Sequence, residues 1–106
     1  MPKYLIEATY SHDGLKGLTR DKASGRSAAV KKAAESIGGK VDAIYYTFGD
    51  SDVIVIADFP DDASLVALEL AVNATGRVNS TTVKLITPED VDKASKKAVT
   101  YQAPGG

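Results

Sequence analysis

The chain has 106 residues, which is the usual size of one domain. Thirteen basic and fourteen acidic residues give a net charge of −1, which argues against nucleic acid or an anionic membrane as a partner. The sequence has no cysteine and one histidine, so we expect no disulfide, no cysteine nucleophile, no metal site and no cofactor. We expect a cytoplasmic protein, because no apolar stretch approaches the roughly 20 residues of a membrane helix and the first residues lack a secretory signal.

The first part of the chain predicts a strand followed by a helix. Residues 3–10 have the pattern of a strand with apolar side chains on both faces. Leu15 and Leu18 indicate a short helical turn, and residues 23–37 predict a longer helix with its apolar residues on one face. Gly38-Gly39 should end that helix, because glycine readily adopts the left-handed conformation of a C-terminal cap.

The rest of the chain predicts two strands, a helix, a strand and a last helix. Residues 41–48 and 53–59 are rich in strand-forming residues, and the short link between them favours an antiparallel hairpin. A helix should begin after Pro60 and end at Gly76, and its only mid-helix polar residues are Glu69 and Asn73. A fourth strand should follow over 78–86, and Thr87-Pro88 is typical of a helix start. We place a single domain at residues 1–98 and a mobile tail at 99–106.

These elements predict an α+β fold of ferredoxin-like βαββαβ order, with a four-stranded antiparallel sheet and an added C-terminal helix. Both main helices would lie on one face of the sheet. Residues 53–59 carry apolar side chains on both faces, so neither face of the sheet is expected to be fully solvated. The simplest cover for the helix-free face is a second copy of the chain, in a homodimer or larger homo-oligomer. The alternative is that the C-terminal helix folds over this face.

Several segments resemble one known family. The run Ile44–Ile54, followed by Phe59-Pro60-Asp61-Asp62, is similar to the signature of the GYD domain family, and residues 10–14, 38–41 and 76–81 also fit its layout. One position departs from the triplet that names the family, because Ser51 stands where that triplet has tyrosine. The resemblance implies a ferredoxin-like fold of the dimeric α/β-barrel kind, in which two sheets face each other. It implies no particular reaction, since the family is largely uncharacterised.

A candidate pocket follows from alternation along the strands that would face a second copy. Glu7 and Thr9 of the first strand and Asp58 of the third are expected on the helix-free face. Lys84 of the fourth strand is expected to join them, while Val83 turns to the helices. A few polar groups within apolar walls are typical of a ligand pocket, and an enclosed carboxylate could serve as a base. The alternative is that Glu7 and Lys84 form a cross-strand pair and that Asp58 lies at a solvated rim.

Two further side chains complete this candidate pocket. The second strand supplies a tyrosine hydroxyl, from Tyr45 or Tyr46, and we favour Tyr46, although the register of the strand is not fixed. His12 follows the first strand and could act as a general acid or base, since histidine titrates near neutral pH. We favour the alternative that His12 is a polar loop residue without a chemical task.

The link Gly49-Asp50-Ser51-Asp52 also has two interpretations. Its two carboxylates, two residues apart, could help to hold Mg²⁺. Aspartate and glycine are also the residues that a tight turn requires, and we favour a turn without a metal.

Three classes of function remain. The first is a module that binds or senses a small molecule in a pocket at the homodimer interface, which explains the lack of an evident catalytic set. The second is a small cofactor-independent enzyme, an isomerase or monooxygenase-like protein, in which Glu7, His12 or Tyr46 would transfer protons. The third is a structural protein whose apolar faces serve oligomerisation. We rank them in that order.

Overall fold

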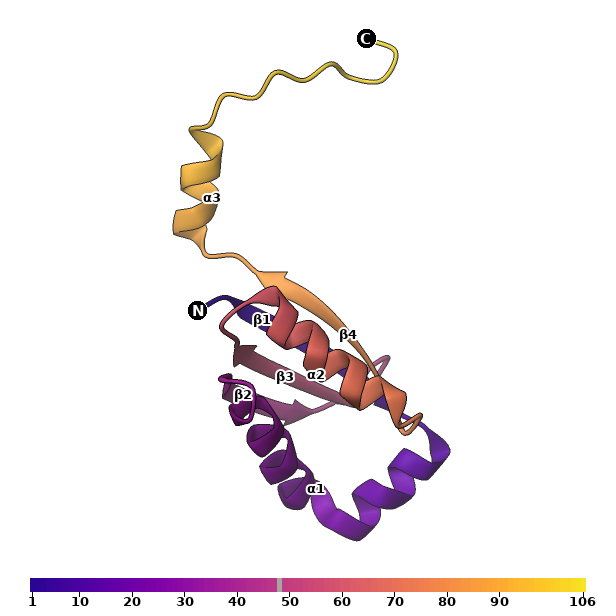
Figure 1. Cartoon of the computed structure of the whole chain (residues 1–106). Coiled ribbons are helices and arrows are strands. Elements are labelled where there is room, and N and C mark those ends of the chain that lie inside the picture. Colours follow the sequence, from indigo (N-terminus) through magenta and orange to yellow (C-terminus); the bar gives the residue numbers. More distant parts are fainter. Residues whose placement is uncertain (48) are drawn as a thin grey trace.

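The computed structural model of the chain describes residues 1–47 and 49–106 (Figure 1). Phe48, which we expected at the end of the second strand, lies outside the described residues. The elements follow in the order β1 (Lys3–Tyr10), α1 (His12–Glu35), β2 (Lys40–Tyr46), β3 (Val53–Asp58), α2 (Asp62–Ala74), β4 (Val78–Leu85) and α3 (Pro88–Ser95). The predicted α+β fold with ferredoxin-like element order and a C-terminal helix is therefore confirmed.

The four strands form one antiparallel sheet in the order β2-β3-β1-β4, so β2 and β4 are its edges. Both α1 and α2 lie on the same face of this sheet (Figure 1). β2 contains a bulge between Val41 and Ala43, where its pairing with β3 shifts by one residue. After the bulge, each side chain of β2 therefore points to the opposite face from the one that strict alternation counted from Val41 would give.

The helix ends are set by local side-chain and backbone chemistry. Asp61 precedes α2, and its carboxylate accepts a hydrogen bond of 2.8 Å from the Ser64 backbone N–H. Thr87 precedes α3 and accepts a bond of 3.1 Å from the Asp90 backbone N–H in the same way. These side chains satisfy N–H groups that have no partner within the helix. The glycine that follows α2, Gly76, has a φ of 70°, as expected for the predicted helix stop.

α1 is broken at Lys22, which has the non-helical angles φ 65° and ψ 159°. The two helical segments on either side of Lys22 form a V in Figure 1. This agrees with the short turn and the longer helix expected from the sequence. The second segment packs against β2, and the break directs it back across the sheet.

The core lies between the sheet and the two main helices. Its buried side chains come mostly from the helix-facing side of β1 and β3, and Tyr4 packs against Phe59 with ring centroids 5.9 Å apart. The buried apolar residues are Tyr4, Ile6, Ala8, Ala34, Val53, Val55, Ala57, Phe59 and Leu65.

The opposite face of the sheet is not covered by any helix or strand in the described part of the chain. Tyr45 and Val83 on this face are 66% and 56% exposed. α3 and the tail extend away from the domain (Figure 1), and every residue from 83 to 106 is exposed. The radius of gyration is 17.0 Å, whereas a compact chain of this length is expected near ~13 Å. The alternative in which the C-terminal helix folds over the helix-free face is therefore not what the structure shows.

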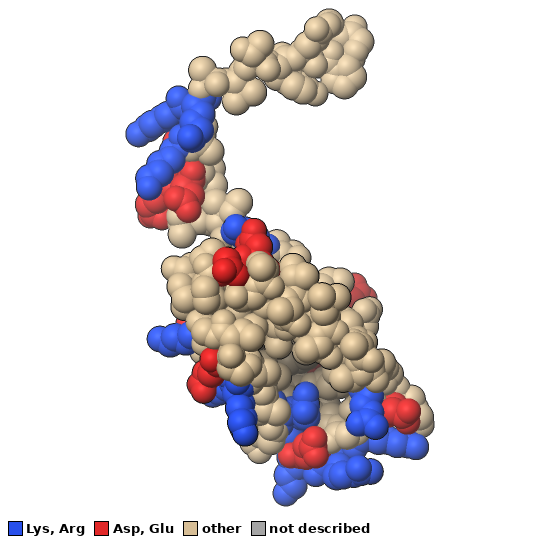
Figure 2. Space-filling view, viewed as in Figure 1, with Lys and Arg blue, Asp and Glu red and all other residues tan. Residues whose placement is uncertain are grey.

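Apolar side chains are also exposed on the outer side of α2, where Val66 and Leu70 are 51% and 68% exposed. In the view of Figure 2, uncharged side chains cover this part of the surface, whereas charged ones gather on α1 and α3. Among the described residues, no helix is both long and apolar enough to span a membrane.

Candidate functional site in a cavity between the helices and the sheet

Three of the residues expected in an interface pocket lie on the helix-free face of the sheet. Glu7 lies opposite Thr81 and Ile54 in the sheet, and Thr9 is two residues further along β1. Asp58 lies at the end of this face, where its carboxylate is 3.1 Å from Lys3 Nζ. Whether these side chains line a pocket depends on a second copy, so the interface pocket stays a prediction.

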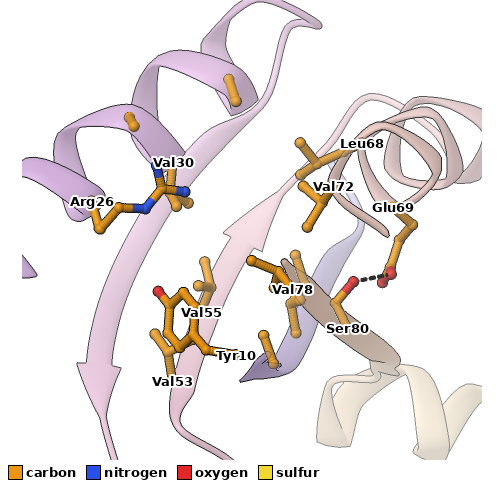
Figure 3. A pocket seen from close by; sticks show the side chains of 14 residues that line it. Tyr10, Arg26, Val30, Val53, Val55, Leu68, Glu69, Val72, Val78 and Ser80 are labelled. Carbon is orange, nitrogen blue, oxygen red and sulfur yellow. Dashed lines mark hydrogen bonds between the residues drawn. The ribbon is translucent and has the colours of Figure 1, made fainter. Parts of the chain in front are cut away.

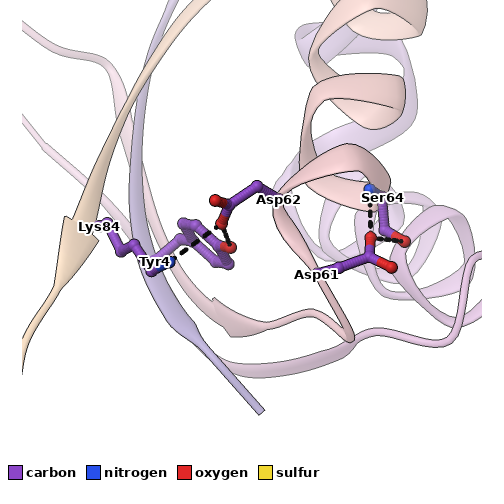
Figure 4. Close-up of polar contacts among 5 residues, drawn as sticks. All are labelled: Tyr4, Asp61, Asp62, Ser64 and Lys84. Atoms are coloured by element: carbon purple, nitrogen blue, oxygen red, sulfur yellow. Dashed lines mark hydrogen bonds and ion pairs between the residues drawn. The ribbon is translucent and has the colours of Figure 1, made fainter.

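The expected position of Lys84 is wrong. Lys84 lies opposite Tyr4 in the pairing of β1 with β4, and directly opposed side chains in an antiparallel pair point to the same face. Because Tyr4 is buried under the helices, Lys84 points to the helix side and Val83 to the helix-free side. The Lys84 ammonium lies 3.2 Å from Asp62 at the start of α2, and the Tyr4 hydroxyl donates to the same carboxylate (Figure 4). A cross-strand pair between Glu7 and Lys84 is excluded by this arrangement.

The preference for Tyr46 over Tyr45 on the helix-free face is also wrong. Tyr45 lies opposite Ile54 on the helix-free face, whereas Tyr46 lies opposite the buried Val53 on the helix side. The physical reason is the bulge in β2, which reverses the alternation counted from Val41. The Tyr46 hydroxyl is 3.2 Å from the backbone oxygen of Ala23 in α1, to which it donates.

The remaining predicted positions lie at the ends of β1 and β3. His12 is exposed in the first turn of α1. In the link that includes Gly49, Asp50 and Ser51, the carboxylate of Asp52 ties the link to β1, because its Oδ2 accepts a bond of 2.8 Å from the backbone N–H of Tyr10. Glu7, His12 and Tyr46 thus lie on three different surfaces, and they do not form one proton-transfer site.

A cavity of about 120 Å³ lies elsewhere, between the sheet and its two main helices. Figure 3 shows Leu68 and Val72 of α2 pointing into it, with Val30 and Arg26 on the α1 side. Its walls are almost wholly apolar. The lining residues are Ile6, Ala8, Tyr10, Arg26, Ala29, Val30, Ala33, Val53, Val55, Leu68, Glu69, Val72, Val78 and Ser80.

The cavity exists because small side chains face it from several elements. α1 presents Ala29 and Ala33 to this space, and β1 presents Ala8. Alanine side chains are too short to bridge the gap between α1 and α2, so the two helices leave open space above the centre of the sheet. Apolar residues on the helix side of β1 and β3 form its floor.

One end of the cavity holds a hydrogen-bonded cluster that joins α2 to β4. Asn73 Nδ2 donates to the backbone oxygen of Glu69 at 2.7 Å and to Glu69 Oε2 at 3.2 Å, and its Oδ1 accepts from the Ser80 backbone N–H at 2.8 Å. Ser80 Oγ donates to Glu69 Oε2 (Figure 3). These bonds use one oxygen of the Glu69 carboxylate and fix the orientation of the group.

The second oxygen of that carboxylate is unpaired. Glu69 Oε1 is buried, and no donor within residues 1–47 and 49–106 is in hydrogen-bonding range of it. Thr82 Oγ1 lies on the same face of β4 as Ser80, and it is likewise buried without a partner among the described residues. Buried polar atoms are normally hydrogen-bonded, and leaving one unpaired costs about 1–3 kcal/mol.

The α1 side of the cavity carries groups that donate hydrogen bonds. Arg26 lines the cavity, and its guanidinium lies 4.0 Å from the carboxylate of Asp21. Burial raises the pKa of Tyr10, and the neighbouring Tyr46 hydroxyl raises it further, while Arg26 acts in the opposite direction. Tyr10 therefore remains a neutral donor across the physiological pH range.

Sequence reasoning missed this cavity, and none of the six residues of the candidate pocket lines it. The signal that could have pointed to it is the pair Glu69 and Asn73, the only polar residues in the middle of an otherwise apolar helix. Their spacing of four residues places them on one face of α2. Within the described part of the chain, no three acidic or histidine side chains are grouped as metal ligands would be.

The sequence profile of the GYD domain matches residues 4–95, which is most of the chain. The chain belongs to the GYD domain family. Among solved structures, this GYD domain is similar to a protein of unknown function from Nitrosomonas europaea, with 20% sequence identity over 97% of this chain and 96% of that chain. The TM-score of that match is 0.43, at which the likeness adds nothing to the fold or the function of the GYD domain. No curated protein matches the sequence.

Proposed function

We propose that this GYD domain binds a small, mostly apolar molecule in the cavity between α1, α2 and the sheet. The observation that carries the proposal is an apolar cavity of about 120 Å³ within a single chain, with few polar residues among those that line it. The class of function is the one ranked first from the sequence, but the site is on the opposite face of the sheet from the predicted interface pocket. An enzymatic role is less well supported, because the groups expected to transfer protons lie apart.

The size and lining of the cavity suit a ligand of about one aromatic ring. An apolar cavity of about 150 Å³ in a protein core can take up benzene, and the space here is about 120 Å³. Ligand sites are typically apolar, with a few polar groups that fix the orientation of the ligand. Glu69 on the α2 side and Arg26 on the α1 side are such groups.

Toluene is a suitable first probe, and its binding can be followed by amide chemical shifts in a ¹⁵N-labelled sample. We expect shifts confined to residues that line the cavity. Ala33→Leu should fill the space and abolish those shifts. Ala28→Leu adds the same side chain at a position of the same helix that does not line the cavity, and it should leave binding intact. Absence of any shift with toluene, amines, alcohols and carboxylates of this size would overturn the proposal.

We also propose that a second copy of the chain covers the helix-free face of the sheet. Support comes from the apolar side chains that this face leaves uncovered, with Tyr45 66% and Val83 56% exposed and Ile54 and Ile56 half-buried between them. Exposed apolar surface of this kind is typical of an interaction site. A homodimer of this kind would bury it.

Light scattering at micromolar concentration tests this self-association. We expect the wild-type chain to have the mass of a dimer and Ile56→Lys, in the middle of the helix-free face, to have the mass of a monomer. Leu70→Lys places the same charge on the other exposed apolar surface, the outer side of α2, and should leave the dimer intact. A monomeric wild type, or a dimer broken by Leu70→Lys alone, would show that the helix-free face is not the interface.

A further inference from the structure

A second cavity, of about 170 Å³, lies between the broken helix α1 and the chain that enters β4. Asp21 lines it from just before the break in α1, and Arg26 lines it from the segment after the break. Arg77, the residue before β4, lines the other side. Two arginines that are distant in the sequence therefore border the same space.

The charge around this second cavity is positive. Among the described residues that line it, Asp21 is the only acidic one, and its carboxylate lies 4.0 Å from Arg26 Nη1. That distance is well beyond the ~2.7–2.9 Å of a charge-assisted hydrogen bond, so Asp21 is a weak competitor for Arg26. No carboxylate of residues 1–47 and 49–106 lies within 4.0 Å of the Arg77 guanidinium. The two arginines thus leave one positive charge more than the carboxylate neutralises.

Backbone contacts fix Arg77 at the wall of the cavity. Its oxygen accepts a bond of 2.9 Å from the Ser11 N–H, and its own N–H donates to Thr75 Oγ1 at 3.1 Å. Gly14 packs directly on the same oxygen, since a Cβ at this position would lie 2.0 Å from it. Arg77 is nevertheless exposed, so a solute can reach its side chain.

The break in α1 sets the position of Arg26. Lys22 has the angles φ 65° and ψ 159°, in a region that glycine normally occupies. A side chain is held in such a region only where the surrounding structure imposes it, and residues of this kind are concentrated at functional sites. Arg26 lies one helical turn after Lys22, so the break determines the direction from which Arg26 borders the cavity.

The other groups at the cavity also suit an anion. A Cβ added to Gly17 would meet no atom of the described residues within 4 Å, so this wall leaves the space open. Tyr10 lines the cavity too, and its raised pKa keeps the hydroxyl protonated and able to donate a hydrogen bond.

We propose that this second cavity binds a small oxyanion, a carboxylate or phosphate group, between Arg26 and Arg77. Each guanidinium presents paired N–H donors that match two oxygens of such a group. The site goes beyond the proposed function, because the apolar cavity is a different space, although Tyr10 and Arg26 border both.

Titration of the ¹⁵N-labelled wild-type chain with sodium phosphate and with sodium acetate, at constant ionic strength, tests the proposal. We expect saturable shifts of the Gly14, Gly17 and Arg77 amides with at least one of the two anions, and the tighter binder identifies the preferred group. Methylammonium chloride at the same concentrations should leave these signals in place.

Substitutions of charged residues separate a site from a diffuse attraction to α1. Arg77→Gln and Arg26→Gln should each weaken anion binding about tenfold, because each removes charge-assisted hydrogen bonds. Arg20→Gln removes the same charge from an exposed position of α1 that does not line the cavity, and it should leave the affinity unchanged.

Acidic residues of α1 provide a test in the opposite direction. Asp21→Asn removes the competing carboxylate and should strengthen binding, whereas Asp13→Asn, outside the cavity, should not. If Arg26→Gln does not fold, Arg77→Gln and Asp21→Asn decide the matter.

The proposal is overturned if neither anion gives saturable shifts, or if Arg20→Gln weakens binding as much as Arg77→Gln does. Either result is independent of the toluene titration, so the proposed function and this anion site can fail separately.

Discussion

The hydroxyl of Tyr4 reaches from β1 to the first turn of α2, where it donates to the Asp62 carboxylate. Lys84 Nζ lies 3.2 Å from the same carboxylate and 5.9 Å from the centroid of the Tyr4 ring. The hydrogen bond to Asp62 raises the pKa of Tyr4 to about 12, and burial of the ring adds to this. The same bond, together with Lys84, lowers the pKa of Asp62.

These pKa shifts predict how stability depends on alkaline pH. The unfolded chain loses the Tyr4 proton near pH 10, whereas the folded chain keeps it until about 12, so rising pH favours unfolding between these values. The stabilisation is complete below pH 10 and is lost as the pH passes about 12. Urea unfolding should therefore show Tyr4→Phe to be less stable than the wild type at pH ~9, with a smaller difference at pH ~11. Tyr101→Phe, in the exposed tail, is the control, and an unchanged Tyr4→Phe difference would contradict the prediction.

At the scale of elements, the start of α1 is held against the chain just before β4 through a glycine. A Cβ added to Gly14 would lie 2.0 Å from the backbone oxygen of Arg77, which also accepts a bond of 2.9 Å from the Ser11 backbone N–H. A Cβ added to Gly17, one turn later in the same helix, would meet no atom of the described residues within 4 Å. The two glycines thus differ in packing although both are helical.

Alanine at these two positions should have opposite effects. Gly14→Ala forces the backbone of Arg77 to move, and we expect the free energy of unfolding to fall by about 1–3 kcal/mol. Gly17→Ala should raise it by about 0.5–1 kcal/mol, because alanine favours the helix and meets no neighbour. Chemical denaturation of both variants measures the pair, and equal effects would show that α1 does not pack against Arg77 in this way.

The order and bounds of the elements could be predicted, but the faces of the edge strands could not. The helix ends could be predicted from the sequence, because Asp61, Thr87 and Gly76 act through hydrogen bonds to residues only a few positions away in the chain. The sequence did not show which side chains of β4 face the helices. Val78 and Val83 point to opposite faces of the sheet, so neither set of alternating positions in this strand is clearly the apolar one. The face of the sheet to which Tyr46 points depends on the bulge in β2, and the sequence of β2 does not indicate that bulge.

The cavity could not be predicted for a different reason. Its existence depends on the distance between α1 and α2, which is set by packing over the whole sheet. Local patterns gave the apolar face of each helix and the polar pair Glu69 and Asn73, but they did not give the space between the helices. The break at Lys22 falls between the short turn and the longer helix expected from the sequence, but the direction that it gives to the second half of α1 could not be predicted.

For the whole molecule, the most prominent feature is the C-terminal arm formed by α3 and the tail. Every residue from 83 to 106 is exposed, so the arm buries little against the domain of its own chain. A chain that ends at Ile86 should therefore match the full chain within about 0.5 kcal/mol in free energy of unfolding. A second truncation at residue 98 tests the domain boundary predicted from the sequence. A stability loss that appears only when residues 87–98 are removed would show that α3 belongs to the folded unit.

The bulge in β2 also bears on how far the sheet can grow. A bulged edge strand offers an irregular row of backbone groups and resists pairing with another strand, whereas β4 presents a regular edge of eight residues. A sheet that can be extended on one side alone can join only one other sheet. Edge-to-edge pairing through β4 would therefore join two copies and leave the two bulged β2 strands as the outer edges, which disfavours growth into a fibril.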